Sequence, residues 1–263
     1  MSEILDKIGQ KRKQRIASEK LEKSMDLVRN AALLACKETK PNRFLSAINT
    51  EGMPQIIAEF KRASPSKGVF ALAAEPAIIA RNYESGGAAA LSVLTEPDFF
   101  CGADQDLLAI KDATSLPILR KDFIIDEYQV YQSALLGADA ILLIAAVLTG
   151  DEIAHFSSIA KELKLDVIVE THTAVELEIA IEANARIIGI NNRNLRNFDV
   201  SVETFISLAK RVPNDRVLIA ESGIKTREDL CLMAKHGANA ALIGETLMRA
   251  PDQIAMLQEL RGF

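Results

Sequence analysis

The sequence has few of the residues that form disulfides or bind metals. It contains three cysteines and three histidines: Cys36, Cys101, Cys231, His155, His172 and His236. The cysteines are far apart, odd in number and form no CxxC motif, so neither a disulfide framework nor a zinc site is predicted. The histidines also lack metal-ligand spacing. We therefore expect no metal and no disulfide.

Long apolar runs and an excess of positive charge are also absent. No apolar run approaches the roughly 20 residues that a membrane-spanning helix needs. The first stretch, MSEILDKIGQKRKQR, is too polar for a secretory signal, so we expect a soluble cytoplasmic protein without membrane contact. The net charge of -5 disfavours nonspecific binding to nucleic acid, but it still allows a local basic pocket for a small anion.

The sequence does contain a repeated alternation of short apolar runs and longer helical segments. Eight β-rich runs cover residues 56–60, 88–94, 117–123, 138–145, 166–170, 186–190, 216–222 and 239–244. Their starts lie 20 to 32 residues apart, close to the ~30 residues of one βα unit. Eight such units predict a closed (β/α)8 TIM barrel, for which a length of 263 residues is suitable. An open doubly wound sheet is the alternative, but no GxGxxG follows the first run.

Local signals mark the ends of the helices. The stretches SGGAAA, LGADA, EANAR and HGANA resemble one joint between a helix end and a strand start, used four times. Thr149, followed by Asp151 and Glu152, predicts the capped start of a helix.

The first 50 residues lie outside the eight units. Their charged helical periodicity predicts a helical extension, residues 1–50, packed against a barrel of residues 51–263 in a single domain. The basic cluster KRKQR at 11–15 could indicate a nucleic-acid site. Four acidic residues lie near it: Glu3, Asp6, Glu19 and Glu22. They favour a solvated helix face instead.

Polar side chains gather at the ends of the apolar runs. They are Glu59, Lys61, Lys121, Glu170, Asn191, Arg193, Glu221 and Ser222. Catalytic groups of a barrel sit at the carboxyl ends of its strands, so these residues predict one shared site. Lys121 shares a strand face with Leu119, and Glu170 with Ile168; if the apolar residues fill the barrel, the charged ones point into its mouth. Convergent opposite charges in a partly dry cavity provide acids and bases near neutral pH, whereas each residue alone could be an ordinary surface residue.

The last two runs carry a different signal. Gly223 follows the seventh run, Gly244 ends the eighth, and each precedes a predicted helix, so backbone N–H groups and two helix N-termini can face an anion. Phosphate binding after the seventh and eighth strands is a recurrent use of this barrel. We therefore favour a phosphate site over simple turns.

Six motifs carry a resemblance to a known family. They are AEFKRASPSKG, LSVLTEPDFFCG, PILRKDFIIDEYQV, IGINNRNL, AESGI and LIGETLM. In order and spacing, from about residue 5 to residue 258, they resemble indole-3-glycerol phosphate synthase of the tryptophan pathway. The resemblance implies that 1-(2-carboxyphenylamino)-1-deoxyribulose 5-phosphate closes a ring and loses carbon dioxide and water to give indole-3-glycerol phosphate. It implies no cofactor.

The resemblance also assigns the site. The implied catalytic residues are Glu59, Lys61, Lys121, Glu170, Asn191, Glu221 and Ser222. The implied phosphate contacts are Ser64, Gly223, Gly244 and Glu245. The positions that line the aromatic and carboxylate end are Phe100, Arg193, Leu195 and Leu242.

The chemistry gives each charged residue a role. A general acid must protonate the ketone oxygen as the arene carbon attacks, and we assign Lys121. Loss of the resulting hydroxyl needs an acid at its oxygen, for which we assign Lys61. It also needs a base for the nitrogen-side proton, for which we assign Glu170. Glu59 and Glu221 would orient the lysines and tune their charge. Lys61 can first hold the substrate carboxylate.

Two loop features complete the prediction. The SPSKG loop would carry Ser64 to the phosphate and, with Gly68, act as a mobile lid. Glu245 stands where some relatives carry Ser, and a carboxylate beside a phosphate would repel it. We therefore expect its side chain to point away, leaving only its N–H at the ligand.

Two other functions are weighed against this one. A related phosphate-binding barrel, such as phosphoribosylanthranilate isomerase, needs one acid and base pair and not two lysines with three glutamates. A non-catalytic sugar-phosphate-binding protein would not need charged residues at every strand end. The expected partner is the anionic small-molecule substrate, and the sequence does not reveal whether other pathway enzymes associate.

Overall fold

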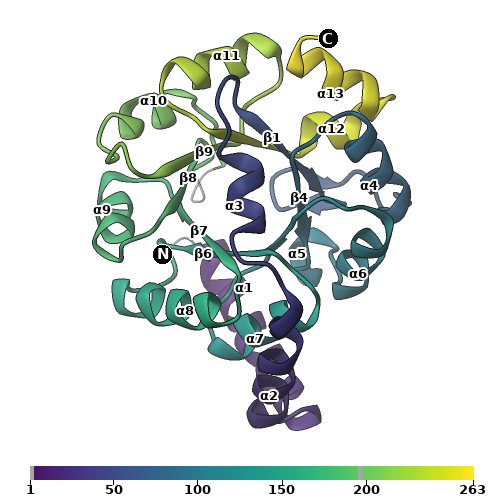
Figure 1. The fold of residues 1–263 in the computed structure, drawn as a ribbon, viewed down its shortest axis with the longest axis vertical. Coiled ribbons are helices and arrows are strands. Elements are labelled where there is room, and N and C mark those ends of the chain that lie inside the picture. Colours follow the sequence, from purple (N-terminus) through teal and green to yellow (C-terminus); the bar gives the residue numbers. More distant parts are fainter. Residues whose placement is uncertain (1–2, 195–197) are drawn as a thin grey trace.

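The computed structural model describes residues 3–194 and 198–263, and its centre is a closed barrel of eight parallel strands (Figure 1). The strands are β1 (Gln55–Phe60), β4 (Ala90–Leu94), β5 (Ile118–Lys121), β6 (Ala140–Ile144), β7 (Asp166–Thr171), β8 (Ile187–Asn191), β9 (Val217–Glu221) and β10 (Ala240–Ile243). Each pairs with its neighbours in the chain, and β1 closes the ring by pairing with β10, where Ile57 lies opposite Leu242. Each predicted run overlaps one of these strands, with ends that differ by a few residues at most, so the (β/α)8 barrel is confirmed.

Helices surround the barrel. They are α4 (Pro76–Ser85), α5 (Pro97–Phe100), α6 (Asp104–Ala113), α7 (Glu127–Leu135), α8 (Gly150–Glu162), α9 (Ala174–Glu182), α10 (Glu203–Ala209), α11 (Arg227–Lys235), α12 (Glu245–Arg249) and α13 (Gln253–Arg261). The predicted start of α8 is confirmed, because Thr149 and Glu152 form a reciprocal capping box there. The four predicted joints turn through the left-handed region at Gly87, Gly137, Asn184 and Gly237.

Two apolar cores position the strand ends. The core inside the barrel consists of Ile57, Leu119, Leu142, Ile168, Ile187, Ile219, Leu242 and their neighbours. Leu119 and Ile168 are fully buried there, which confirms that the faces carrying Lys121 and Glu170 turn inward. A second core fills the space between the strands and the surrounding helices.

The first segment of the chain covers both ends of the barrel. It forms α1 (Glu3–Glu22), α2 (Met25–Ala35), the short η1 (Cys36–Glu38) and α3 (Arg43–Ile48). Helix α3 lies across the centre of the barrel in Figure 1 and inserts Phe44, Leu45 and Ile48 into the inner core. The Leu45 N–H donates to Asp166 at the start of β7, which places α3 at the amino-terminal end. Helix α1 lies behind the barrel in that view.

The prediction that residues 11–15 form a solvated helix face is wrong for Arg12. The side chain is only 2% exposed, and its guanidinium donates to Oδ2 of the buried Asp122 at 2.9 Å. Arg12 lies on the face of α1 that also buries Leu5, Ile8 and Ile16. This spacing, rather than the local charge, is the signal that could have identified it.

Replacing Arg12 with Met is expected to lower the free energy of unfolding by about 3 kcal/mol, because a buried carboxylate loses its ion-pair partner. We place the loss at the lower end because Arg120 still lies 3.5 Å from Asp122. Urea unfolding measures it. The double variant Arg12→Met/Asp122→Asn should lose less than Arg12→Met alone, and Lys13→Met, at an exposed position of the same helix, should change stability by less than about 0.5 kcal/mol. Equal losses in the single and double variants would contradict the buried-charge explanation.

Candidate active site

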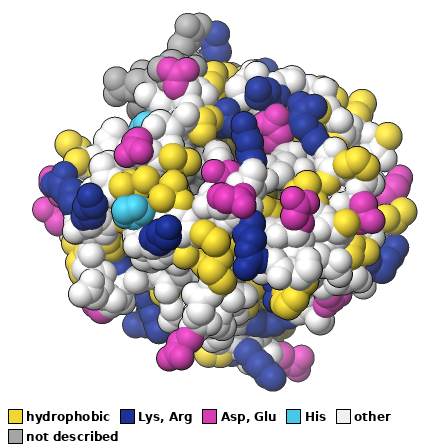
Figure 2. Space-filling model, turned by 90° about the horizontal axis from the view of Figure 1, so that it is seen from above, with side chains coloured by type: hydrophobic (Ala, Val, Ile, Leu, Met, Phe, Trp, Pro, Cys, Tyr) yellow, Lys and Arg dark blue, Asp and Glu magenta, His cyan; other side chains and the backbone are white. Residues whose placement is uncertain are grey.

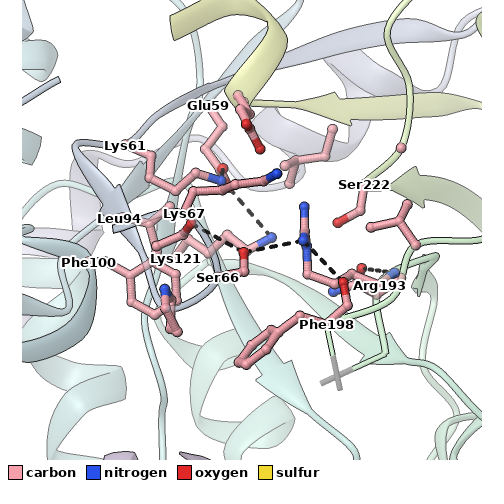
Figure 3. Close-up of a pocket in the computed structure, with 18 of the residues that line it drawn as sticks. Glu59, Lys61, Ser66, Lys67, Leu94, Phe100, Lys121, Arg193, Phe198 and Ser222 are labelled. Carbon is pink, nitrogen blue, oxygen red and sulfur yellow. Dashed lines mark hydrogen bonds and ion pairs between the residues drawn. The ribbon is translucent and has the colours of Figure 1, made fainter. Parts of the chain in front are cut away.

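A cavity of about 1000 Å³ opens at the carboxyl ends of the strands. Its floor carries polar residues from several strands, and Ile4, Leu5 and Ile8 of α1 form part of its wall. Just after β1, a small antiparallel sheet of β2 (Ala63–Ser64) and β3 (Gly68–Val69) holds the SPSKG loop over it. Figure 3 shows Glu59, Lys61, Lys121 and Ser222 facing one shared space.

Lys121 lies at the centre of three carboxylates. Its Nζ is 2.7 Å from Oε2 of Glu221 and 3.7 Å from Oε2 of both Glu59 and Glu170. Burial alone would lower the pKa of Lys121, but the negative charges of Glu221, Glu59 and Glu170 raise it above its ordinary value. The amine is therefore held in the ammonium form.

Glu59 joins the two lysines. Its Oε1 accepts a hydrogen bond from Lys61 Nζ, while its other oxygen faces Lys121. Burial raises the pKa of Glu59, but the charges of Lys61 and Lys121 outweigh that effect, and the net pKa lies below the ordinary value. Glu59 is therefore a carboxylate near neutral pH.

Glu170 has the opposite character. Burial, together with the nearby Glu221 charge, raises the pKa of Glu170 to about 8, although Lys121 and a hydrogen bond from Asn191 act to lower it. Its carboxyl is therefore mostly protonated at pH 7 and ionised above pH 8. Glu221 is 1% exposed and supports Lys121 from within the barrel.

The predicted phosphate residues Ser64, Gly223, Gly244 and Glu245 all line the cavity, and they follow β1, β9 and β10, which are consecutive in the barrel. Helix α12 begins directly after Gly244, as predicted. The prediction that Gly223 precedes a helix start is wrong, because Ser222 and Gly223 form a left-handed turn and α11 begins only at Arg227. Thr226 takes the capping role, so the capping box is a stronger helix-start signal than the glycine.

The Glu245 carboxylate has a local partner. Its Oε1 accepts a hydrogen bond from Nε of Arg249, one turn later in α12, at 3.1 Å. Arg249 also lies over the ring of Phe70, with 4.8 Å between its guanidinium carbon and the ring centroid. The acidic charge at this position is therefore offset by a neighbouring cation.

The aromatic end of the cavity is built around Phe100. Glu96, fully buried, accepts hydrogen bonds from the backbone N–H groups of Asp98, Phe99 and Phe100 and so holds the short helix α5 in place. The Phe100 ring packs near Phe123, with centroids 6.1 Å apart. Leu242 and Arg193 also line the cavity, and Leu195 lies outside the described residues.

Sequence reasoning missed several residues of this cavity. They are Ile4, Leu5, Ile8, Lys67, Phe123, Lys225, Thr246 and Arg249. The apolar spacing of α1 and the position of Phe123 in the KDF motif were available signals. Lys67 lies in the SPSKG loop that was predicted to reach the phosphate. The cations of Lys225 and Arg249 had no such signal in the sequence, because their approach depends on how a loop and α12 pack.

Other kinds of site find no support in the described part of the chain. Among residues 3–194 and 198–263, no three His, Cys, Asp or Glu side chains cluster in a way that could hold a metal ion. None of the helices in these ranges is long and apolar enough to cross a membrane. On the face in Figure 2, basic side chains lie interspersed with acidic ones.

Comparison with known proteins agrees with this geometry. A family model described as indole-3-glycerol phosphate synthase matches residues 5–260. The chain belongs to the indole-3-glycerol phosphate synthase family. A curated relative of that name from Lachnoclostridium phytofermentans is 43% identical over 268 residues, covering 98% of this chain and 99% of the relative. One from Legionella pneumophila is 47% identical over 250 residues, covering 94% and 97%.

Membership of the indole-3-glycerol phosphate synthase family makes this chain a decarboxylating, ring-closing lyase of tryptophan biosynthesis. Solved structures of lower identity show the same fold. A thiamine phosphate pyrophosphorylase from Pyrococcus furiosus aligns with a TM-score of 0.60 at 16% identity, covering 82% of this chain and 96% of that one. A 3-hexulose-6-phosphate synthase from Salmonella typhimurium aligns with a TM-score of 0.64 at 14% identity, covering 78% and 96%.

In this family member, Glu170 should titrate near pH 8 in the ligand-free protein. Glu221→Gln should lower that pKa, because it removes a nearby negative charge, and Asn191→Ala should raise it, because it removes a hydrogen bond to the carboxylate. Carbon-13 NMR of labelled glutamate carboxyls measures both shifts. Glu182→Gln, at an exposed position, serves as the control. Titration of Glu170 near its ordinary value of 4.5 would contradict this account of the site.

Proposed function

We propose that Lys121 is the general acid of ring closure on 1-(2-carboxyphenylamino)-1-deoxyribulose 5-phosphate. The observation that carries this proposal is the position of its ammonium group among three carboxylates at the base of the cavity. The arene carbon is a weak nucleophile, and the ketone oxygen becomes strongly basic as attack proceeds. A lysine held protonated can transfer its proton to such an oxygen even with a raised pKa.

Glu170 then returns a proton to Lys121. Its protonated carboxyl lies 3.7 Å from the Lys121 nitrogen, within reach after a small movement. This transfer regenerates the ammonium and leaves Glu170 as a carboxylate. Loss of carbon dioxide meanwhile restores the aromatic ring, because the electrons of the departing carboxylate return to it.

Dehydration begins with Glu170 as a carboxylate and Lys61 protonated. Lys61 donates a proton to the departing hydroxyl, which leaves as water, and Glu170 accepts a proton from the ring CH2 carbon beside the nitrogen, so that the carbon–carbon double bond of the indole forms. Glu170 is then protonated again, and Lys61 recovers its proton from solvent. One proton is consumed in total, which balances the loss of a carboxylate as carbon dioxide. The short contact with Glu59 keeps Lys61 directed into the cavity.

Substrate orientation follows from the two ends of the cavity. The phosphate would bind at Ser64 and at the backbone N–H groups near Gly223 and Gly244, which line the cavity after the consecutive strands β1, β9 and β10. The aromatic ring would lie near Phe100 and Leu242, with Leu195 kept as a prediction. The substrate carboxylate would meet Lys61 or Arg193 before it leaves. Asn191 would hold Glu170, and Ser222 would contact the substrate from the turn after β9.

Further proposals concern the setting of the enzyme. We place it in the cytoplasm, which the three free thiols Cys36, Cys101 and Cys231 support, because reduced cysteines are typical of that compartment.

We also propose that residues 1–263 act as one domain, since α1 contributes to the cavity wall.

Lys121→Ala should lower the rate of product formation by about 10²- to 10⁴-fold, the usual contribution of a general acid. Indole fluorescence on mixing with substrate in EDTA measures it, because the chain contains no Trp. Lys210→Ala, at an exposed position, should retain the full rate. Turnover of the Lys121→Ala variant near the wild-type rate would refute the assignment.

Glu245→Ser should change the KM for substrate little, because Arg249 already offsets the carboxylate. Arg249→Ala should raise KM roughly fivefold, about 1 kcal/mol, because it leaves an unpaired negative charge beside the phosphate. The double variant should recover the wild-type KM. Equal KM values for the Arg249→Ala and double variants would contradict the charge-offset explanation.

A further inference from the structure

Two glutamates of the site lie against glycines of a neighbouring strand. A Cβ atom built on Gly189, in β8, would overlap Oε1 of Glu221 and lie 3.3 Å from its Cδ. A Cβ atom built on Gly244, just after β10, would overlap Oε1 of Glu59 and lie 3.0 Å from its Cδ. Both carboxylates therefore occupy space that any other residue would fill.

The backbone does not require glycine at either position. Gly244 has φ of -116°, and Gly189 lies in a regular strand and is not among the glycines with positive φ. Glycine in a strand weakens it, because the unfolded chain loses more conformational freedom and no side chain packs. The backbone therefore does not explain these two glycines, but the carboxylate oxygens that occupy the position of a Cβ atom do.

Both glutamates lean in the same direction around the barrel, each toward the next strand in the order of the sheet. The strand order is β1, β10, β9, β8, so Glu59 leans from β1 toward β10 and Glu221 leans from β9 toward β8. Each leaning carboxylate directs its second oxygen at Lys121, at 3.7 Å for Glu59 and 2.7 Å for Glu221. The lysine is thus supported by glutamates from two separate strands.

The Glu221 contact depends especially on space. Its Oε1 is buried and has no hydrogen-bond partner within the described residues. A methyl group at Gly189 would displace the carboxylate, and with it the partner of Lys121.

We propose that Gly189 and Gly244 are positioning residues of the catalytic site. Because these glycines have no side chain, Glu221 and Glu59 can lean over the neighbouring strands and hold the lysines in place. This inference rests on the roles proposed above for Lys61 and Lys121. It gives Gly244 a task separate from any backbone contact with phosphate, because alanine keeps the N–H group but fills the space.

The test is Gly189→Ala and Gly244→Ala, each compared with Gly150→Ala. Gly150 begins α8, and among the described residues its added Cβ would come within 4 Å of Ile179 alone, at 3.8 Å. The first two variants should lose about 100-fold in kcat while KM changes less than about threefold, and Gly150→Ala should match the wild type. Inhibition by inorganic phosphate should be unchanged in Gly244→Ala.

Paired variants separate positioning from general damage. Glu221→Asp shortens the side chain, so its loss in kcat should be smaller when Gly189 is already Ala than in the wild type. In the same way, the loss in kcat caused by Glu59→Asp should be smaller when Gly244 is already Ala than in the wild type. Additive losses in kcat for either pair would overturn the proposal.

A readout without turnover distinguishes this proposal from the catalytic roles. In ligand-free Gly189→Ala, displacement of Glu221 should move the Glu170 titration measured by carbon-13 NMR, whereas Gly150→Ala should not. A shifted titration with unchanged kcat would overturn the catalytic roles and keep the positioning. An unshifted titration would overturn the positioning itself. If Gly189→Ala fails to fold, recovery of folding by added Glu221→Asp supports the overlap, and failure of both contradicts it.

Discussion

The ion cluster around Lys121 is the constraint on which the rest of the site depends. Three glutamates and two lysines share a largely buried space at the mouth of the barrel. Burying charge is costly unless opposite charges are paired, and here a protonated Glu170 brings the formal charges into balance. The cluster therefore places two ammonium groups, two carboxylates and one protonated carboxyl within a few ångströms of one another.

The barrel supplies the geometry that this cluster needs. Glu59, Lys121, Glu170 and Glu221 come from four different strands, and the inner core below them fixes the direction of each side chain. Because the strands are locked by their ladder and by Leu119 and Ile168 beneath, the charged groups cannot relax apart. Rigid support of this kind is what allows like charges to be held together for chemistry.

Much of this arrangement could be predicted from the sequence, because it repeats. Alternation of apolar runs located all eight strands, and side-chain alternation identified Lys121 and Glu170 as inward-facing. The burial of Arg12 could not be read from local charge, since its partner Asp122 lies 110 residues away. The cations near the phosphate side and the space over Gly189 likewise depend on contacts between distant segments, whereas the start of α11 had a local signal in the capping box of Thr226 and Asp229.

Residues 3–48 pack against residues that lie more than 100 positions further along the chain and are synthesised later. Helix α1 is tied to Asp122, and α3 is tied to Asp166, 121 residues beyond Leu45. At about 5–20 residues per second, a ribosome needs roughly 6 to 24 s to add that length of chain. During that interval, the apolar faces of α1 and α3 have no barrel to cover them. This segment therefore reaches its final place only after residues 110 and 121 positions further along the chain have been made, and a newly made chain depends on its staying unaggregated until then.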